Sequence, residues 1–121
     1  MSLRIHSEFI SEKNIWKMEL IGEIDIYTAS QLKSEFQSIL EKKKTPIEMD
    51  FKNLEYIDST GLGVLIGALK RLREDDKDIT LYHVKPSIKK LLNLTGLNQI
   101  FIIKGWKSLY ERRENSFINT K

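Results

Sequence analysis

The organisation of this chain follows from one stretch, Asp58-Ser59-Thr60-Gly61-Leu62-Gly63. The preceding Tyr56-Ile57 segment has strand character, and apolar residues recur at helical spacing after the stretch. The stretch therefore predicts a turn from a strand into a helix, with Ser59 exposed at the helix start. Backbone N–H groups in the first turn of a helix lack partners within it, and the helix dipole makes that end positive. A phosphate on Ser59 would be stabilised there.

The residues alone leave two interpretations of Ser59 open. In the first, Ser59 or Asp58 only caps the helix, which contributes about 1 kcal/mol. In the second, Ser59 is a phosphorylation switch. A phosphate brings about −1.5 to −2 charges, and Asp58 opposes it. The fold would tolerate this charge, whereas a partner docked on the surface would not. Local physical chemistry by itself favours the cap.

Composition limits the class of protein. A chain of 121 residues with 40% hydrophobic content predicts one domain with a buried core. The sequence has no cysteine and only two histidines, so we expect no disulfide and no metal site. No secretory signal is visible, and the longest nearly apolar run, 61–69, is too short to span a bilayer. We therefore expect a soluble, cytoplasmic protein that does not associate with membranes.

The charge pattern does not indicate a nucleic-acid-binding protein. The net charge of +3 arises from 20 basic and 17 acidic residues. The basic clusters fall mostly toward predicted helix ends, where the helix dipole favours cations. They lie at 42–44, 70–73, 89–90 and 112–113. No aromatic residues interleave with them as stacking platforms, so we expect solvated helix ends and no direct contact with nucleic acid.

Alternation of apolar and polar residues predicts strands at residues 3–9, 16–20 and 47–51. A polar turn at 11–14 joins the first two into a hairpin. A β-rich run at 79–84 and a final apolar run at 100–103 predict two further strands.

Helices are predicted between these strands. Thr28 and Gln31 have the spacing of a capping box, and this first helix closes at 42–44 before Pro46. The second helix runs from the 58–63 stretch to the charged run at 73–78. The third opens at Lys85-Pro86 and closes with Gly96 in the left-handed conformation. Trp106, Leu109 and Tyr110 suggest a short terminal helix, and the tail after it is expected to fray.

The order β-β-α-β-α-β-α-β-(α) predicts an α/β fold with a mixed, largely parallel sheet, an N-terminal hairpin and three to four helices. The alternating strands indicate that one face of the sheet is less completely covered than in a doubly wound fold.

Catalysis is not indicated. Ser59 does not lie in the Gly-x-Ser-x-Gly turn of serine hydrolases, and His6 and His83 both fall within strand patterns. The Gly61-Leu62-Gly63 segment is too short for a phosphate-binding loop and no Gly-Lys-Ser/Thr follows it. We expect no catalytic residue and no cofactor.

Three elements in order resemble the STAS domain, and most closely its single-domain form, the bacterial anti-sigma-factor antagonist family. They are Gly22-Glu23-Ile24-Asp25, the 58–63 stretch and Leu94-Thr95-Gly96-Leu97. The resemblance covers residues 3–112, which we take as a STAS domain, with 113–121 as a C-terminal tail.

The resemblance implies a partner-switching mechanism. In this family the unphosphorylated antagonist binds an anti-sigma factor that is also a serine kinase, and thereby frees the sigma factor. The kinase phosphorylates the antagonist, which ends binding, and a serine phosphatase resets the cycle. Ser59 matches the phosphoacceptor. The residues that match the partner-binding surface are Asp25, Asp58, Ser59, Thr60, Gly61 and Gly63.

The family further implies a regulatory protein that is not an enzyme, and we expect a monomer or weak dimer. Two other functions stay open. The chain could be a STAS module of another signalling scaffold, or an accessory STAS domain that binds a ligand or serves lipid transport.

Overall fold

The computed structural model describes residues 2–105. Within this range the chain forms a six-stranded sheet and three α-helices. The predicted terminal helix at 106–110, the tail at 113–121 and the end of the predicted domain at 112 lie outside the described residues.

The strands form one mixed sheet in the order β1-β2-β3-β5-β6, with β4 paired to β2 off this path. β1 and β2 are an antiparallel hairpin, and the other pairings are parallel. This confirms the predicted α/β class, the largely parallel sheet and the N-terminal hairpin. The strands are β1 (Leu3–Ile10), β2 (Ile15–Ile24), β3 (Ile47–Asp50), β4 (Leu54–Ile57), β5 (Ile79–Tyr82) and β6 (Ile102–Lys104).

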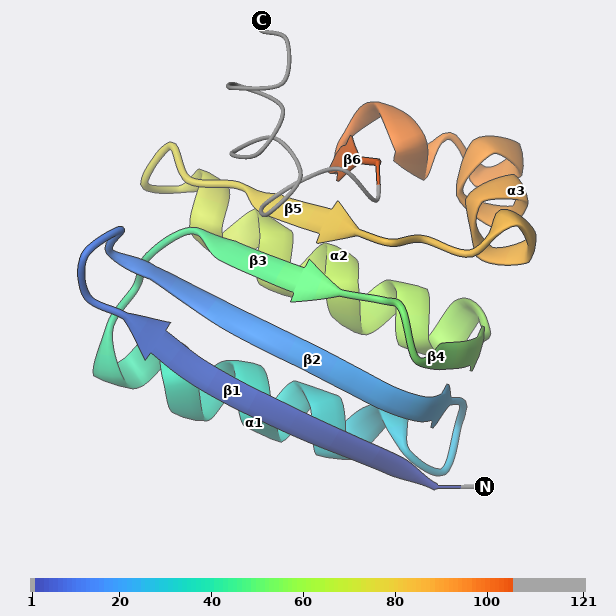
Figure 1. The fold of residues 1–121 in the computed structure, drawn as a ribbon, viewed down its shortest axis with the longest axis horizontal. Helices are drawn as coiled ribbons and strands as arrows, with labels where there is room; N and C mark the ends of the chain where they lie inside the picture. Colours follow the sequence, from blue (N-terminus) through green and yellow to red (C-terminus); the bar gives the residue numbers. More distant parts are fainter. Residues whose placement is uncertain (1, 106–121) are drawn as a thin grey trace, which may run out of the picture.

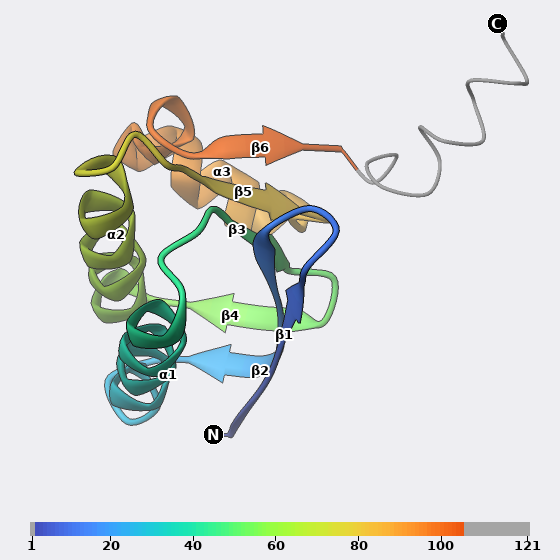
Figure 2. The same ribbon diagram turned by 90° about the vertical axis from the view of Figure 1, so that its left-hand side faces the viewer.

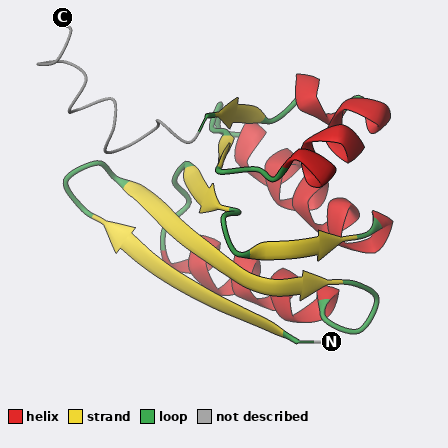
Figure 3. Cartoon of the chain, turned by 45° about the vertical axis from the view of Figure 1, so that its right-hand side comes forward, coloured by secondary structure: helices red, strands yellow, loops and turns green. Residues whose placement is uncertain are grey.

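The helices are α1 (Ala29–Lys42), α2 (Ser59–Arg73) and α3 (Pro86–Thr95), followed by a short 3₁₀ helix, η1 (Leu97–Gln99). In Figure 1 the sheet lies in front of α1 and α2, with α3 toward the β6 end of the molecule. Figure 2 shows α1 and α2 side by side against the same face of the sheet. Figure 3 shows strands on one side of the molecule and these two helices on the other.

The core lies between the sheet and the two helices. Alternate residues of β2 and β3, among them Met18, Leu20 and Met49, are fully buried, as are Leu65 and Leu72 of α2. Most intervening residues, such as Lys17, Glu19, Glu48 and Asp50, are polar and face the other side of the sheet. The period of two in the sequence therefore directs each apolar side chain toward α1 and α2.

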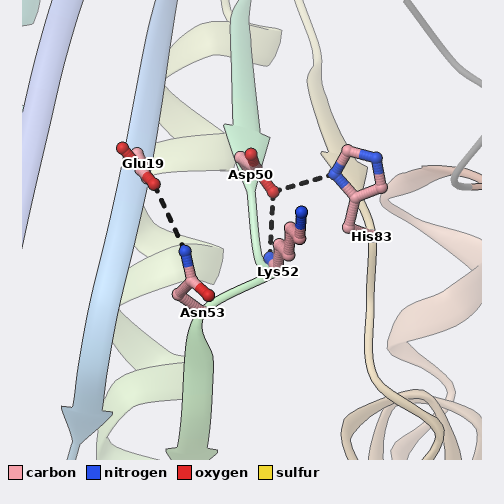
Figure 4. A network of polar contacts seen from close by, with 5 residues as sticks. All are labelled: Glu19, Asp50, Lys52, Asn53 and His83. Carbon is pink, nitrogen blue, oxygen red and sulfur yellow. Dashed lines mark hydrogen bonds and ion pairs between the residues drawn. The ribbon is translucent and has the colours of Figure 1, made fainter.

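Polar contacts on the other face of the sheet join residues of β2, the end of β3, the β3–β4 loop and the residue after β5 (Figure 4). The Asp50 Oδ1 atom accepts a hydrogen bond from the Lys52 backbone N–H at 2.9 Å and lies 2.9 Å from His83 Nδ1. The Asn53 Nδ2 atom donates to Glu19 at 3.4 Å. These contacts connect β2, the end of β3 and the residue after β5. His83 therefore lies just after β5 and contacts the end of β3, so the prediction that it falls within a strand is wrong.

Three strand boundaries differ from the sequence prediction by two residues or more. β2 continues through Gly22 to Ile24, in a segment predicted as a loop. β5 stops at Tyr82 because His83 takes the left-handed conformation, with φ 58°. The last strand begins at Ile102, because the 3₁₀ turn occupies 97–99 and the Ile100 N–H still bonds to Leu97 O at 3.1 Å.

β4 was predicted only in its second half, where Tyr56-Ile57 has strand character, and the expected order of elements did not count it as a separate strand. Only Leu54 and Ile57 of its four residues are buried, so the segment does not alternate. It pairs with the end of β2 across a shift in register at Gly22 and Glu23. A strand this short depends on its distant partner, which leaves little local signal.

None of the helices within residues 2–105 has the length and apolarity needed to cross a membrane. In the same part of the chain, no three histidine, aspartate or glutamate side chains are grouped so that they could hold a metal ion.

Candidate functional site

Ser59 is the first residue of α2 and its side chain is exposed. The sheet determines this position. Ile57 at the end of β4 is the register partner of Ile24 at the end of β2, and the Asp58 N–H donates to Ile24 O at 3.1 Å. Because parallel strands end at the same edge, the loop after β2 and the start of α2 become neighbours.

Asp58, rather than Ser59, caps α2. Its backbone is extended, with φ −106° and ψ −173°, and its Oδ1 atom accepts a hydrogen bond from the Gly61 N–H at 3.1 Å. The Leu62 N–H donates to Asp58 O at 2.9 Å, which begins the helical ladder. The Ser59 hydroxyl has no hydrogen bond to any residue in the range 2–105. Asp58 therefore caps the helix, and the Ser59 hydroxyl remains free to be modified.

Gly61 allows the first turn of α2 to pack against the strand ends. A Cβ atom at this position would lie 2.5 Å from Ile24 Cγ2 and 2.8 Å from Ile57 Cγ1. Both distances are too short, so a side chain here would push α2 away from β2 and β4. Gly63 has no such constraint, since a Cβ there would meet no atom within 4 Å.

Asp25 organises the loop between β2 and α1. The residue is only 6% exposed. Its Oδ1 atom accepts hydrogen bonds from the backbone N–H groups of Tyr27, at 2.9 Å, and Thr28, at 3.1 Å. A buried carboxylate requires such donors. Its carboxylate thus contributes to the site by shaping a loop that lies beside the start of α2.

The predicted capping box of Thr28 and Gln31 is wrong. The Thr28 hydroxyl donates to Glu23 O at 2.8 Å and accepts from the Asp25 N–H at 2.9 Å, so it makes no bond to the N–H groups of α1. The Gln31 side chain donates to Leu3 O at 2.9 Å. Both side chains are drawn to backbone groups of the neighbouring strands, and the Asp25 carboxylate satisfies N–H groups at the helix start instead.

Sequence reasoning missed the exposed apolar residues of this end of the sheet. Ile26 and Tyr27, in the loop that Asp25 shapes, are 64% and 80% exposed. Tyr56 of β4 is also exposed. Two adjacent apolar residues in a loop are the signal that could have identified them, because an ordered loop has no folding reason to present them to water.

Of the predicted site residues, Asp25, Asp58, Ser59, Thr60 and Gly61 meet at this edge of the sheet. Ser59, Thr60 and Gly63 are exposed, whereas Asp25 and Gly61 are buried. Gly63 lies one turn further along α2, on the side that faces α1. The arrangement presents a hydroxyl at the positive end of a 15-residue helix, beside an apolar loop. It can accept a charged modification and contact a protein surface.

The sequence model of the STAS domain matches residues 8–114, which is most of the chain. This chain belongs to the STAS domain family. It is 29% identical over 98 residues to the anti-sigma-B factor antagonist of Staphylococcus epidermidis, covering 81% of this chain and 91% of that protein. The anti-sigma-B factor antagonist of Staphylococcus aureus strain NCTC 8325 is equally similar, at 29% identity over 98 residues and with the same coverage of both chains.

Solved structures share the fold of this STAS domain. The anti-sigma factor antagonist of Mycobacterium paratuberculosis superimposes with a TM-score of 0.77 at 19% identity, over 98% of this chain and 96% of that one. Unphosphorylated SpoIIAA, also an anti-sigma factor antagonist, gives 0.69 at 18% identity, over 98% of this chain and 100% of that one. The phosphorylated form of Bacillus SpoIIAA gives the same TM-score at 20% identity, over 93% and 97%.

Proposed function

We propose that this STAS domain is an anti-sigma-factor antagonist that is switched by phosphorylation of Ser59. The unphosphorylated form binds an anti-sigma factor that is also a serine kinase, and a phosphate on Ser59 ends that binding. One observation carries the proposal: Ser59 stands exposed at the first position of α2 while Asp58 provides the cap. The hydroxyl can be modified without loss of the bond that begins the helix.

The same geometry explains why a phosphate would act on the surface and not on the fold. The free N–H groups and the dipole at the start of α2 favour an added negative charge by about 0.3–1 kcal/mol, and the nearby Asp58 carboxylate offsets part of this. The fold therefore changes little in stability. The electrostatic potential at the surface becomes more negative, which weakens complementarity to a bound partner.

The predicted partner-binding residues have different roles in this proposal. Ser59, Thr60 and Gly63 are exposed and contact the partner directly. Asp25, Asp58 and Gly61 act by position, because their side chains or backbone hold the loop and the first turn of α2 in place. The exposed Ile26 and Tyr27 add apolar contact area to the same surface.

The proposal assigns the nucleotide to the kinase, so the chain itself needs no cofactor and catalyses no reaction. A serine phosphatase would restore the binding form. The cycle takes place in the cytoplasm, where sigma factors work, and a monomer or weak dimer would suffice for it. The related anti-sigma-B factor antagonists support this assignment.

The test uses the full chain and the purified anti-sigma serine kinases of its own bacterium, with and without ATP. We expect phosphate at Ser59 by mass spectrometry. We expect Ser59→Ala to bind the kinase without being phosphorylated, and Ser59→Asp to bind more weakly by calorimetry, because the added charge opposes docking.

Ser87 provides a matched control, since it is another exposed serine in the first turn of a helix, α3. Ser87→Asp should bind the kinase as the wild type does. Phosphate at a residue other than Ser59 would refute the site. Association with a signalling scaffold that contains no anti-sigma factor, or with a lipid, would refute the function.

A further inference from the structure

A groove of about 460 Å³ runs between α1 and α2, and its lining includes Thr60, the residue after Ser59. Figure 2 shows the two helices lying next to each other. The lining residues are Lys33, Phe36 and Gln37 from α1, and Thr60, Gly63, Val64, Gly67, Ala68 and Arg71 from α2. The groove is therefore continuous with the proposed phosphorylation site, because Thr60 directly follows Ser59.

Two glycines keep the groove open. Gly63 and Gly67 stand one helical turn apart on α2, and a Cβ atom at either position would meet no atom within 4 Å. The packing of α2 therefore does not require glycine at these positions, in contrast to Gly61. Glycine also weakens a helix relative to alanine. The consequence of both glycines is a shallow channel along an otherwise regular helix.

The groove is positively charged. Lys33 and Arg71 flank it from opposite helices, and no aspartate or glutamate is among its lining residues. Neither cation forms an ion pair with another residue between 2 and 105. The positive end of the α2 dipole lies at the Thr60 end. Val64 provides apolar surface between the charges, and Phe36, which also lines the groove, is only 3% exposed.

We propose that this groove receives an acidic segment with an apolar face from the anti-sigma serine kinase; this inference rests on the proposed function. Charge complementarity selects an acidic partner, and continuity with Ser59 places the segment in the same interface. Thr60, Gly63, Gly67 and Arg71 share one side of α2, so the contact extends along about 16 Å of the helix. A second copy of this chain fits poorly, since pairing the same surface would bring Lys33 and Arg71 against cations of the same kind.

The proposal gives the switch a physical mechanism. A phosphate on Ser59 places a negative charge next to Thr60, at the mouth of the groove. An acidic segment bound between Lys33 and Arg71 would then be repelled at one end. Phosphorylation therefore weakens binding without moving either helix.

Calorimetry with the purified kinase tests the groove. We expect Arg71→Glu to weaken binding at least about tenfold, since it reverses a charge that faces the acidic segment. Gly67→Leu should have a similar effect because its side chain fills the channel. It should fold normally, because the position opens to empty space. Circular dichroism melting checks the fold of each variant.

Lys70→Glu and Ser38→Leu are matched controls, since both residues are exposed on the same two helices and neither lines the groove. Both should bind within about twofold of the wild type, as expected outside an energetic hot spot. A photoreactive benzophenone amino acid in place of Gln37, an exposed residue that lines the groove from α1, should cross-link to a kinase peptide rich in aspartate and glutamate. A cross-link to a basic kinase peptide, or to a second copy of the chain, would overturn the proposal.

The outcomes separate the two proposals. If the kinase binds the wild type and Ser59→Asp releases it, but Arg71→Glu and Gly67→Leu bind normally, the function stands and the groove inference is refuted. If no anti-sigma serine kinase binds the wild-type chain, the proposed function is refuted and the groove inference with it.

Discussion

Asp58 and Ser59 are adjacent residues with different structural roles. The Asp58 carboxylate accepts the Gly61 N–H and starts α2, while the Ser59 side chain points to solvent. A serine that both capped the helix and accepted phosphate would lose its capping bond on every modification. Because Asp58, not Ser59, caps α2, phosphorylation of Ser59 can change the surface charge while the start of the helix stays intact.

Substitution of the two residues should separate these roles in stability measurements. We expect Asp58→Ala to lower the free energy of unfolding by about 1 kcal/mol, because it removes the cap. Ser59→Ala should change that free energy by less than about 0.5 kcal/mol, as is usual for an exposed side chain without a partner. Urea denaturation followed by circular dichroism measures both. Equal losses for the two variants would show that Ser59 shares in capping.

At the scale of single elements, α2 serves the fold and the site on different sides. Leu62, Leu65, Leu69 and Leu72 are buried against the sheet, while Gly63 and Gly67 are exposed toward the groove. The apolar spacing predicted the buried side. The groove depends on where α1 lies, and no periodicity within α2 contains that information.

The buried side of α2 can be tested at Leu65, which is fully buried. Leu65→Ala removes part of a core side chain and leaves a cavity, so we expect a loss of about 2–5 kcal/mol in the free energy of unfolding. Lys70→Ala, on the exposed side of the same helix, should stay within about 0.5 kcal/mol of the wild type. Thermal and urea melts of the two variants give the comparison. A negligible shift for Leu65→Ala would contradict the assigned core.

At the scale of the whole molecule, the described strands differ in how much of their length is paired. β2 is paired along its length with β1 on one side and with β3 and β4 on the other. β6 has three residues and pairs with β5. Arg73 at the end of α2 adds a link to the segment before β6, because its Nη2 atom donates to Ile100 O at 2.6 Å and its Nε atom to Asp78 at 3.0 Å.

Hydrogen exchange should show that β6 opens more easily than β2 and β3. We expect amides of β2 and β3 to exchange through global unfolding and those of β6 through local opening at lower free energy. Arg73→Ala should ease the opening of residues 100–104 by about 0.2–1 kcal/mol, since the Arg73 side chain is half exposed and its ion pair is weakened by solvent. Mass spectrometry of exchanged peptides measures this. Unchanged exchange at 100–104 in Arg73→Ala would exclude the anchoring role.

Much of the fold was predictable because its signals are local. Alternation identified the hairpin and β3, a β-rich run identified β5, and helical spacing identified α1 and α2. Gly96 ends α3 in the predicted left-handed conformation, with φ 77°. β4 was predicted only through the strand character of Tyr56-Ile57, because the rest of the strand forms through its pairing with β2, far earlier in the chain. The Thr28–Gln31 capping box failed for the same reason: strand backbone groups compete for those side chains.

The sequence by itself determined the α/β order of elements, the strand-to-helix turn at 58–63 and membership of the STAS family. Each depends on residues within a few positions of one another, where periodicity and capping act. Only the tertiary structure decided that Asp58 caps and Ser59 stays available, that buried Asp25 shapes a loop exposing Ile26 and Tyr27, and that a basic groove opens between α1 and α2. The first two are short-range hydrogen bonds, and the sequence left open which side chain makes them until the backbone is folded. The groove needs α1 and α2, which are distant in the chain, to pack against the same face of the sheet.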